Sequence, residues 1–243
     1  MHFYAVIIGT EILNGRREDQ HFHFIKNELA QYGHELFASM VIKDDPNLIK
    51  QTFKLIQGDP ESILFSFGGI GSTPDDLTRE IASEVFRSSP VEVHQKFLQD
   101  IINRFGEKAY PHRIHMADLP PKSELLFNPI NNMSGFSLDN RFFFTPGFPS
   151  MAHPMLHEVI KKSFSNSEEK FSLSLIANTS EETLISLMQK LPESIELSCL
   201  PMFIDQKPKV ELRLRSSNKE AVEEHFDRFK AFLDRENINY VLH

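Results

Sequence analysis

Glycines and carboxylates stand side by side in one short stretch, FSFGGIGSTPDDLTRE, residues 65–80. Gly68, Gly69 and Gly71 follow an apolar run typical of a buried strand, at the end where open α/β sheets bind ligands. Glycine lacks a Cβ, so a backbone rich in it turns sharply and approaches a ligand closely. Asp75 and Asp76 follow at once, and their charge repels phosphate. The stretch therefore predicts a ligand site in which the glycines favour the binding of phosphate and the carboxylates oppose it.

A helix is predicted to start inside this stretch, after Ser72, with Thr73 as its N-cap and Pro74 as its first residue. Its first N–H groups would then face a bound anion. Asp75 and Asp76 have a structural alternative here, because negative charge in a first helical turn is favoured by roughly 0.3–1 kcal/mol. Capping and chemistry both remain open for these two carboxylates. A P-loop is excluded, since TPDD stands where Lys-Ser/Thr is required.

A divalent cation would reconcile the glycines with the carboxylates. Magnesium is commonly held by one or two carboxylates together with the phosphate oxygens of the substrate. Asp44 ends the second predicted strand and has no evident structural role, whereas the neighbouring Asp45 is expected to cap the helix that begins at Pro46. Glu11 follows the first strand, although a loop carboxylate is usually solvated. We therefore predict Asp76 and Asp44 as metal-binding and catalytic residues, with Asp75 and Glu11 as further ligands of Mg, Mn or Co.

The elements that position these residues alternate between strands and helices. This order predicts a mostly parallel sheet with helices on both faces and an antiparallel hairpin that turns at Asp139-Asn140. Strands are expected at residues 3–8, 35–42, 62–67 and 124–128, and helices at 22–32, 46–58, 76–86, 93–105 and 150–164.

A second, smaller domain is predicted after a polar linker at residues 163–170. The order βαββαβ that follows is typical of a ferredoxin-like split unit. Its strands are expected at residues 171–177, 195–200, 210–215 and 238–242, and its helices at 181–191 and 219–234. The predicted domains are therefore 1–164, an α/β domain, and 170–243, a small α+β domain.

Composition excludes several classes of function. The formal net charge of -8 argues against a nucleic-acid partner, because a basic face supplies most non-specific affinity. Cys199 is the only cysteine, so neither an internal disulfide nor a cysteine-based zinc cluster is expected. No stretch approaches the roughly 18 apolar residues that a membrane span needs, and the N-terminus does not read as a signal peptide. We expect a cytoplasmic protein without a membrane partner.

Five segments, in order, resemble the competence/damage-inducible protein A (CinA-like) family, a branch of the molybdopterin-binding, MogA-like fold. The similarity covers about residues 3–160. The segments are GTEILNG with the following Asp19, VIKDDPNLI, GGIGSTPDDLTRE, the central HRIHMADLP with LLFNPINNMSGF, and FFFTPGFPSMAHPM.

The resemblance implies a three-layer α/β domain that binds a nucleotide or pterin-like small molecule at the carboxyl edge of its sheet. Some CinA-like proteins are similar to metal-dependent pyrophosphatases acting on ADP-ribose, and the molybdopterin branch binds or adenylylates a pterin. Asp76 and Asp44 align with acidic positions that matter in that branch. Relatives tend to form homo-oligomers, so a dimer or trimer is expected. The ligand contacts implied are Gly68, Gly69, Gly71, Ser72, Thr73, Asp19, Asn128, Pro146, Gly147 and Ser150.

The chain departs from the family pattern at several loop positions. Gln20-His21 replaces Thr-Asn, Lys43 replaces Gly, Ser72 replaces Pro, and Asn131-Asn132 replaces a glycine-containing turn. Bulky residues in turns of close approach would narrow the pocket, so the departures concern catalysis more than the fold. The sequence therefore predicts a metal-dependent hydrolase of a nucleoside diphosphate derivative such as ADP-ribose. The alternatives are a pterin-binding protein or adenylyltransferase, and a non-catalytic binding module.

Overall fold

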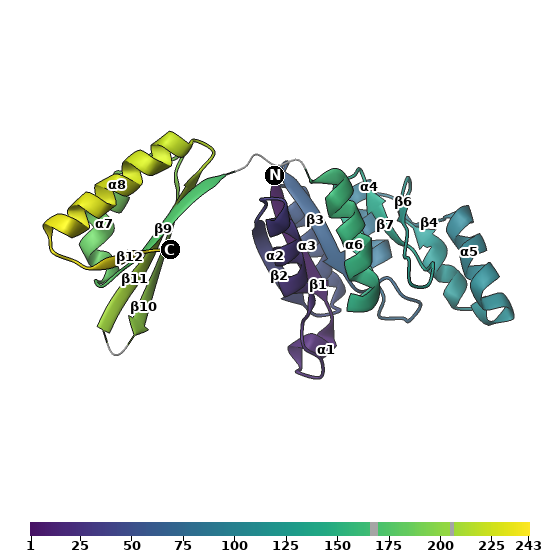
Figure 1. Ribbon diagram of the computed structural model, residues 1–243. Coiled ribbons are helices and arrows are strands. Elements are labelled where there is room, and N and C mark those ends of the chain that lie inside the picture. Colours follow the sequence, from purple (N-terminus) through teal and green to yellow (C-terminus); the bar gives the residue numbers. More distant parts are fainter. Residues whose placement is uncertain (166–169, 205–206) are drawn as a thin grey trace. The chain divides into compact units, whose positions relative to one another are not determined.

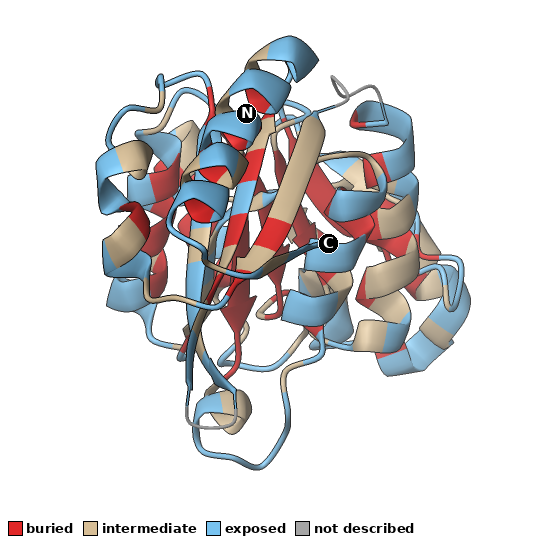
Figure 2. Cartoon of the chain, turned by 60° about the vertical axis from the view of Figure 1, so that its left-hand side comes forward, coloured by how far each residue is buried: buried red, intermediate tan, exposed pale blue. Residues whose placement is uncertain are grey.

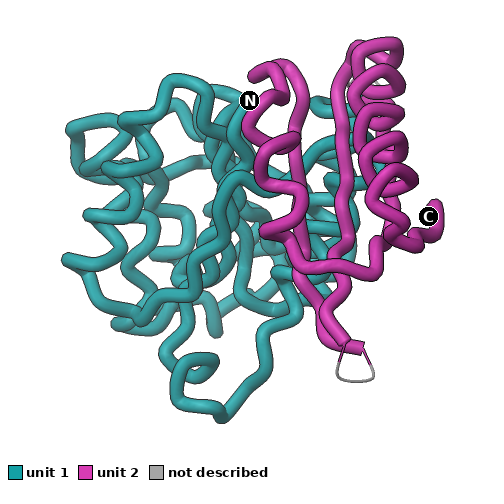
Figure 3. Tube along the Cα trace, turned by 90° about the vertical axis from the view of Figure 1, so that its left-hand side faces the viewer, with its two compact units in different colours: residues 1–167 teal, residues 168–243 magenta. Residues whose placement is uncertain are grey.

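The computed structural model describes residues 1–165, 170–204 and 207–243 of the 243-residue chain. Its contacts divide the chain into two compact units, residues 1–167 and 168–243, shown in teal and magenta in Figure 3. Of the predicted linker at 163–170, residues 166–169 lie outside the described residues.

Unit 1 is built on a six-stranded sheet in the order β2-β1-β3-β8-β7-β6 (Figure 1). Its strands are β1 (His2–Ile8), β2 (Leu36–Ile42), β3 (Ser62–Phe67), β6 (Glu124–Leu126), β7 (Gly135–Leu138) and β8 (Phe142–Thr145). The first four in space are parallel, and β7 then pairs antiparallel with both β8 and β6. The mixed, mostly parallel sheet is confirmed, and so is the hairpin, because Asp139 and Asn140 both have positive φ at its turn.

Helices cover both faces of this sheet, as the alternation of strands and helices predicts. One face packs against α2 (His21–Gln31) and α6 (Pro149–Ser163). The other packs against α3 (Pro46–Gln57), α4 (Thr78–Arg87) and α5 (Gln95–Phe105). Figure 2 shows the buried residues gathered on the strands and the inward sides of the helices. The predicted three layers are therefore present.

Short elements complete unit 1. They are α1 (Thr10–Leu13), the paired strands β4 (Glu92–Val93) and β5 (Asp118–Leu119), and 3-10 turns at Gly106–Ala109 and Arg113–Ala117. Local signals set several boundaries of the longer elements. Asp45 caps α3 by accepting a hydrogen bond from the Leu48 N–H at 2.8 Å, as predicted. Gly33 has the positive φ expected just after α2.

Unit 2 contains an antiparallel sheet in the order β10-β11-β9-β12. Its strands are β9 (Phe171–Ala177), β10 (Glu196–Ile204), β11 (Lys207–Ser216) and β12 (Tyr240–Leu242). One face of the sheet packs against α8 (Lys219–Arg235). The predicted helix at 181–191 is wrong in extent: it is a 3-10 turn, Glu181–Leu184, followed by α7 (Ile185–Met188). The tight turn brings Leu184 fully into the core of unit 2.

Within the described ranges, none of the helices is long and apolar enough to cross a membrane.

Candidate functional site

Loops from four neighbouring strands meet at the carboxyl edge of the sheet in unit 1. The Gly9 N–H donates to the carbonyl oxygen at the end of β2, on Ile42, at 3.0 Å. On the other side of β1, the Gly68 N–H donates to the carbonyl of Thr145, the last residue of β8, at 2.9 Å. The parallel strands end in register, so the loops after β1, β2, β3 and β8 form one cluster.

Two glycines allow the backbones of neighbouring loops in this cluster to approach each other closely. Gly68 has a φ of +99°, and a Cβ added there would lie 2.4 Å from the Ile8 carbonyl oxygen. A Cβ added at Gly147 would lie 3.3 Å from the Cα of Gly68. The loops after β3 and β8 therefore contact each other through backbone atoms. The contact places Gly68 and Gly147 side by side, and their use in one ligand site stays a prediction.

The predicted start of the helix at Thr73 is wrong. The helix α4 begins at Thr78, and residues Thr73 to Asp76 form a separate turn in which the Asp76 N–H donates to the Thr73 carbonyl at 3.0 Å. The reason lies in Thr78, whose N–H donates to the Gly69 carbonyl at 2.9 Å and whose hydroxyl donates to the Gly68 carbonyl at 3.0 Å. The first turn of α4 thus binds the glycine loop.

Asp76 is held inside this loop. Its carboxylate accepts hydrogen bonds from the Thr73 N–H at 2.8 Å and from the Thr73 hydroxyl at 2.6 Å. A Cβ added at Gly71 would lie 2.5 Å from the same carboxylate oxygen, Oδ2. These contacts orient the side chain while Oδ1 accepts no hydrogen bond from the described residues. The adjacent Asp75 is exposed.

Asp44 has a structural role that the sequence did not reveal. Its Oδ2 accepts hydrogen bonds from the Thr10 N–H at 2.7 Å and the Thr10 hydroxyl at 2.8 Å, which joins the loops after β1 and β2. Glu11 is half-buried, with its Oε1 3.5 Å from Arg17 Nη1. The sequence expectation that Asp44 has no structural function is therefore corrected. The contact nevertheless places its carboxylate at the carboxyl edge.

The predicted metal ligands do not form a ready-made centre. In the part of the chain that the structure describes, no group of three or more His, Cys, Asp and Glu side chains is close enough together to hold a metal ion. Asp76 and Asp44 each use one carboxylate oxygen to hold a threonine. The donor set therefore fits a cation that substrate oxygens complete, and does not fit a resident ion held by the protein alone.

Other residues expected to contact a ligand hold their own loops together. The two carboxylate oxygens of Asp19 accept from the N–H groups of His21, at 2.8 Å, and Phe22, at 3.2 Å, and so cap α2. Asn128 is fully buried within the β6–β7 loop. Its side-chain NH2 group donates to the Met133 carbonyl, and its Oδ1 accepts from the Ile130 N–H. Pro146, in the loop before α6, is half-buried, and Ser150, in the first turn of α6, is exposed. Ser72 is half-buried in the glycine loop.

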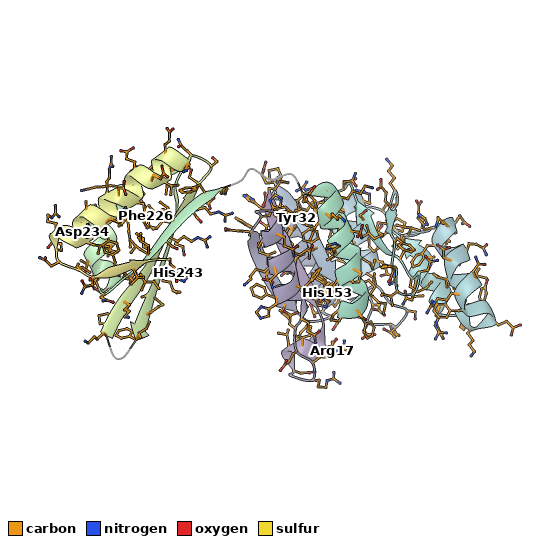
Figure 4. All side chains as sticks on the ribbon, in the orientation of Figure 1. Arg17, Tyr32, His153, Phe226, Asp234 and His243 are labelled. Atoms are coloured by element: carbon orange, nitrogen blue, oxygen red, sulfur yellow. The ribbon has the colours of Figure 1, made fainter. Side chains whose placement is uncertain are left out.

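A pair of histidines at the edge of this cluster was not found from the sequence. His21 stacks on Phe67 at 4.2 Å, and its Nε2 lies 3.3 Å from the Gly147 carbonyl oxygen. Because that carbonyl accepts, Nε2 carries the proton and Nδ1 is left as an acceptor for His153 Nε2–H, at 3.2 Å. Figure 4 labels His153 on α6. The partners are 132 residues apart, so no local pattern links them.

The histidine pair predicts a dependence of stability on pH. Burial lowers the pKa of His21, and burial with the neighbouring His21 lowers the pKa of His153 from 6.5 to about 4. Between pH 6.5 and about pH 4, His153 binds a proton in the unfolded chain but stays neutral in the folded chain. The free energy of unfolding is therefore greatest above about pH 6.5 and falls as the pH drops toward 4. Chemical denaturation at pH 7.5 and 5 should show the loss, and His153→Asn should make it smaller. An equal loss in this variant would contradict the assignment.

A groove of about 640 Å³ lies away from the loop cluster, between α6 and strands β6 to β8. Leu126, Phe127, Phe143 and Val159 contribute to its apolar lining. None of the residues predicted from the sequence to bind a ligand or a metal lines this groove.

Comparison with known proteins gives matches over unit 1 and, for some relatives, beyond it. A family model described as a probable molybdopterin binding domain matches residues 4–166. A CinA-like protein of Nostoc punctiforme is 30% identical over 229 residues, covering 88% of this chain and 53% of the relative. A putative competence-damage inducible protein of Bacillus pumilus is 27% identical over 66% of this chain and 39% of its own length.

A solved structure also matches. It is described as the protein CinA, with unknown function, from Thermoplasma acidophilum, and it superposes with a TM-score of 0.60 at 25% identity. The match covers 67% of this chain and 98% of that one. The curated relatives are longer, and the chain spans about half of the Nostoc relative and less of the Bacillus one.

Proposed function

The chain belongs to the family of probable molybdopterin-binding domains, and from that premise we propose that unit 1 is a phosphohydrolase. It binds a phosphorylated small molecule, a nucleotide or a pterin, at the loop cluster. It then hydrolyses the diphosphate of an ADP-ribose-like compound when a divalent cation is supplied. Mg, Mn and Co are the candidate cations.

One observation carries the anion-binding part of this proposal. The carbonyls of Gly68 and Gly69 accept hydrogen bonds from Thr78, and the carbonyl of Gly71 accepts one from Arg79. In a trans peptide the carbonyl and the next N–H point in opposite directions. The N–H groups of Gly69, Ile70 and Ser72 therefore face away from α4, and none of them has an acceptor among the described residues. Neighbouring unpaired backbone N–H groups in a loop of this kind bind anions.

The carboxylates would complete the site around a bound diphosphate. Thr73 orients Asp76, and Thr10 orients Asp44, so each can offer its remaining oxygen to a cation that also binds phosphate oxygens. Such a cation, when bound, polarises a phosphoryl oxygen and lowers the pKa of an attacking water. The loop N–H groups would orient the diphosphate for this attack. Asp75 and Glu11 are candidates for further contact with the cation or its waters.

The direct test is hydrolysis by the purified full chain. Incubation with ADP-ribose and magnesium, manganese or cobalt should release AMP, and excess EDTA should stop the release. Chromatographic separation of AMP from ADP-ribose measures the rate. Absence of AMP with all three metals would contradict the hydrolase assignment and leave the binding part of the proposal to be tested separately.

A second candidate is a binding protein without hydrolytic activity. The lack of a three-ligand metal group in the described ranges favours it, and so do the departures at Lys43, Ser72 and Asn131. This candidate predicts stabilisation by a pterin, such as molybdopterin, or by a nucleotide in the presence of EDTA, with no turnover. A thermal-shift screen of nucleotides and pterins, each with and without metal, separates it from the hydrolase.

A further inference from the structure

Arg79 is a buried cation directly beneath the glycine loop. It is the second residue of α4 and is 4% exposed. Its Nη1 donates to the Gly71 carbonyl at 2.6 Å, and its Nε has no hydrogen-bond partner. Among the described residues, no carboxylate lies within ion-pair distance of its guanidinium, and Glu80, Asp76 and Asp118 act on it only through longer-range electrostatics. A buried charge without a direct partner is costly, so its presence here calls for a compensating anion.

The carboxylates that face Arg79 act only from a distance. They are Asp76 on the loop, Glu80 on α4 and Asp118 on β5. Their charges favour the protonated guanidinium, but burial has the larger effect and lowers the pKa of Arg79 below its usual range. An arginine nevertheless stays protonated in proteins. The base of the loop therefore keeps a positive charge that the protein compensates incompletely.

We infer that Arg79 is a positioning residue that supplies the buried counter-charge for a diphosphate bound by the glycine loop. Its bond to Gly71 turns the following N–H, on Ser72, away from α4. The guanidinium lies on the carbonyl side of the Gly71–Ser72 peptide, and the anion would bind on the N–H side. The positive charge of Arg79 therefore attracts the anion across this peptide. The ligand class is an inorganic or organic diphosphate. This inference rests on the proposed function for the identity of the site, but it requires neither hydrolysis nor a metal.

The test compares two arginines of one helix. Pyrophosphate binding in EDTA is measured by calorimetry on the full chain, for the wild type and for Arg79→Met, Arg79→Lys and Arg87→Met. Arg79→Met should weaken binding by about tenfold or more, because a buried charge roughly 8 Å from the anion, across the Gly71–Ser72 peptide, is lost. Arg79→Lys keeps the charge and should recover most of the affinity. Arg87 lies at the other end of α4, paired with Asp139 at 2.9 Å, so Arg87→Met should bind normally.

Stability distinguishes this role from a merely structural one. Arg79→Met removes the desolvation cost of a buried charge together with the hydrogen bond to the Gly71 carbonyl, so its thermal midpoint should stay within a few degrees of the wild type while it loses affinity. If that variant does not fold, Arg79→Gln, which retains an N–H donor for Gly71, replaces it with the same expected loss. Wild-type affinity in the folded variant that lacks the charge would overturn the inference. So would a wild type that does not bind pyrophosphate at millimolar concentration.

These outcomes are separable from those of the proposed hydrolysis. Binding that depends on Arg79, without release of AMP from ADP-ribose, supports the counter-charge and contradicts the hydrolase. Release of AMP with the same KM in wild type and Arg79→Met supports the hydrolase and contradicts the counter-charge.

Discussion

Replacing Asp76 by Asn is expected to lower the rate of AMP release from ADP-ribose by roughly 100-fold or more, the scale of losing one charged metal ligand. Asn retains an oxygen that can accept from the Thr73 N–H, so the turn from Thr73 to Asp76 should persist. The change thus removes the charge and leaves the loop in place. Rates at saturating ADP-ribose and metal measure the effect, and the thermal midpoint should stay close to that of the wild type.

Asp75→Asn is the matched comparison, because the two carboxylates are adjacent but differ in environment. Asp76 is half-buried against Gly71, whereas Asp75 is exposed. We expect Asp75→Asn to retain activity within about threefold, a difference of less than 1 kcal/mol in the barrier. Equal losses in the two variants would mean that the pair acts together. A fully active Asp76→Asn would remove Asp76 from the metal site.

Gly68→Ala is expected to destabilise unit 1 by about 3 kcal/mol, through backbone strain and a steric clash together. Its φ of +99° disfavours any side chain, and the added Cβ would lie 2.4 Å from the Ile8 carbonyl oxygen. Relief requires β1 and β3 to move apart at the edge where the loops meet. Amide hydrogen exchange should show faster opening of β1 and β3, with β9 and β11 of unit 2 unchanged.

Gly15→Ala separates these two contributions. Gly15 also has a positive φ, +77°, but no atom lies within 4 Å of an added Cβ. Only the conformational penalty applies there, about 1 kcal/mol. Equal effects of the two substitutions on the free energy of unfolding would show that the contact between Gly68 and Ile8 contributes nothing.

Several features of the fold follow from the sequence alone, because they depend on neighbours in the chain. Asp45 before Pro46 caps α3, and Asp139-Asn140 takes the positive φ values of a tight hairpin turn. The continuous apolar run of β3 indicates a strand buried on both faces, and all its residues are buried. Each of these outcomes is set within a few residues, so the local pattern is sufficient.

The start of α4 shows where local reasoning stops. Thr73 and Pro74 have the residue types that begin a helix, yet the helix begins at Thr78. The hydrogen bonds from Thr78 to Gly68 and Gly69 decide this, and they span the whole glycine loop. A capping preference is worth about 1 kcal/mol. Several hydrogen bonds made together in a packed loop outweigh it.

The sequence by itself determined the kind of site: a glycine loop with carboxylates at the carboxyl edge of a parallel sheet. Only the tertiary structure decided how these residues are used. It joined Asp44 to Thr10 and His21 to His153, and it buried Arg79 beneath Gly71. The physical reason is that hydrogen bonding and burial depend on which strands and helices become neighbours. Positions far apart in the chain carry no local pattern that records this.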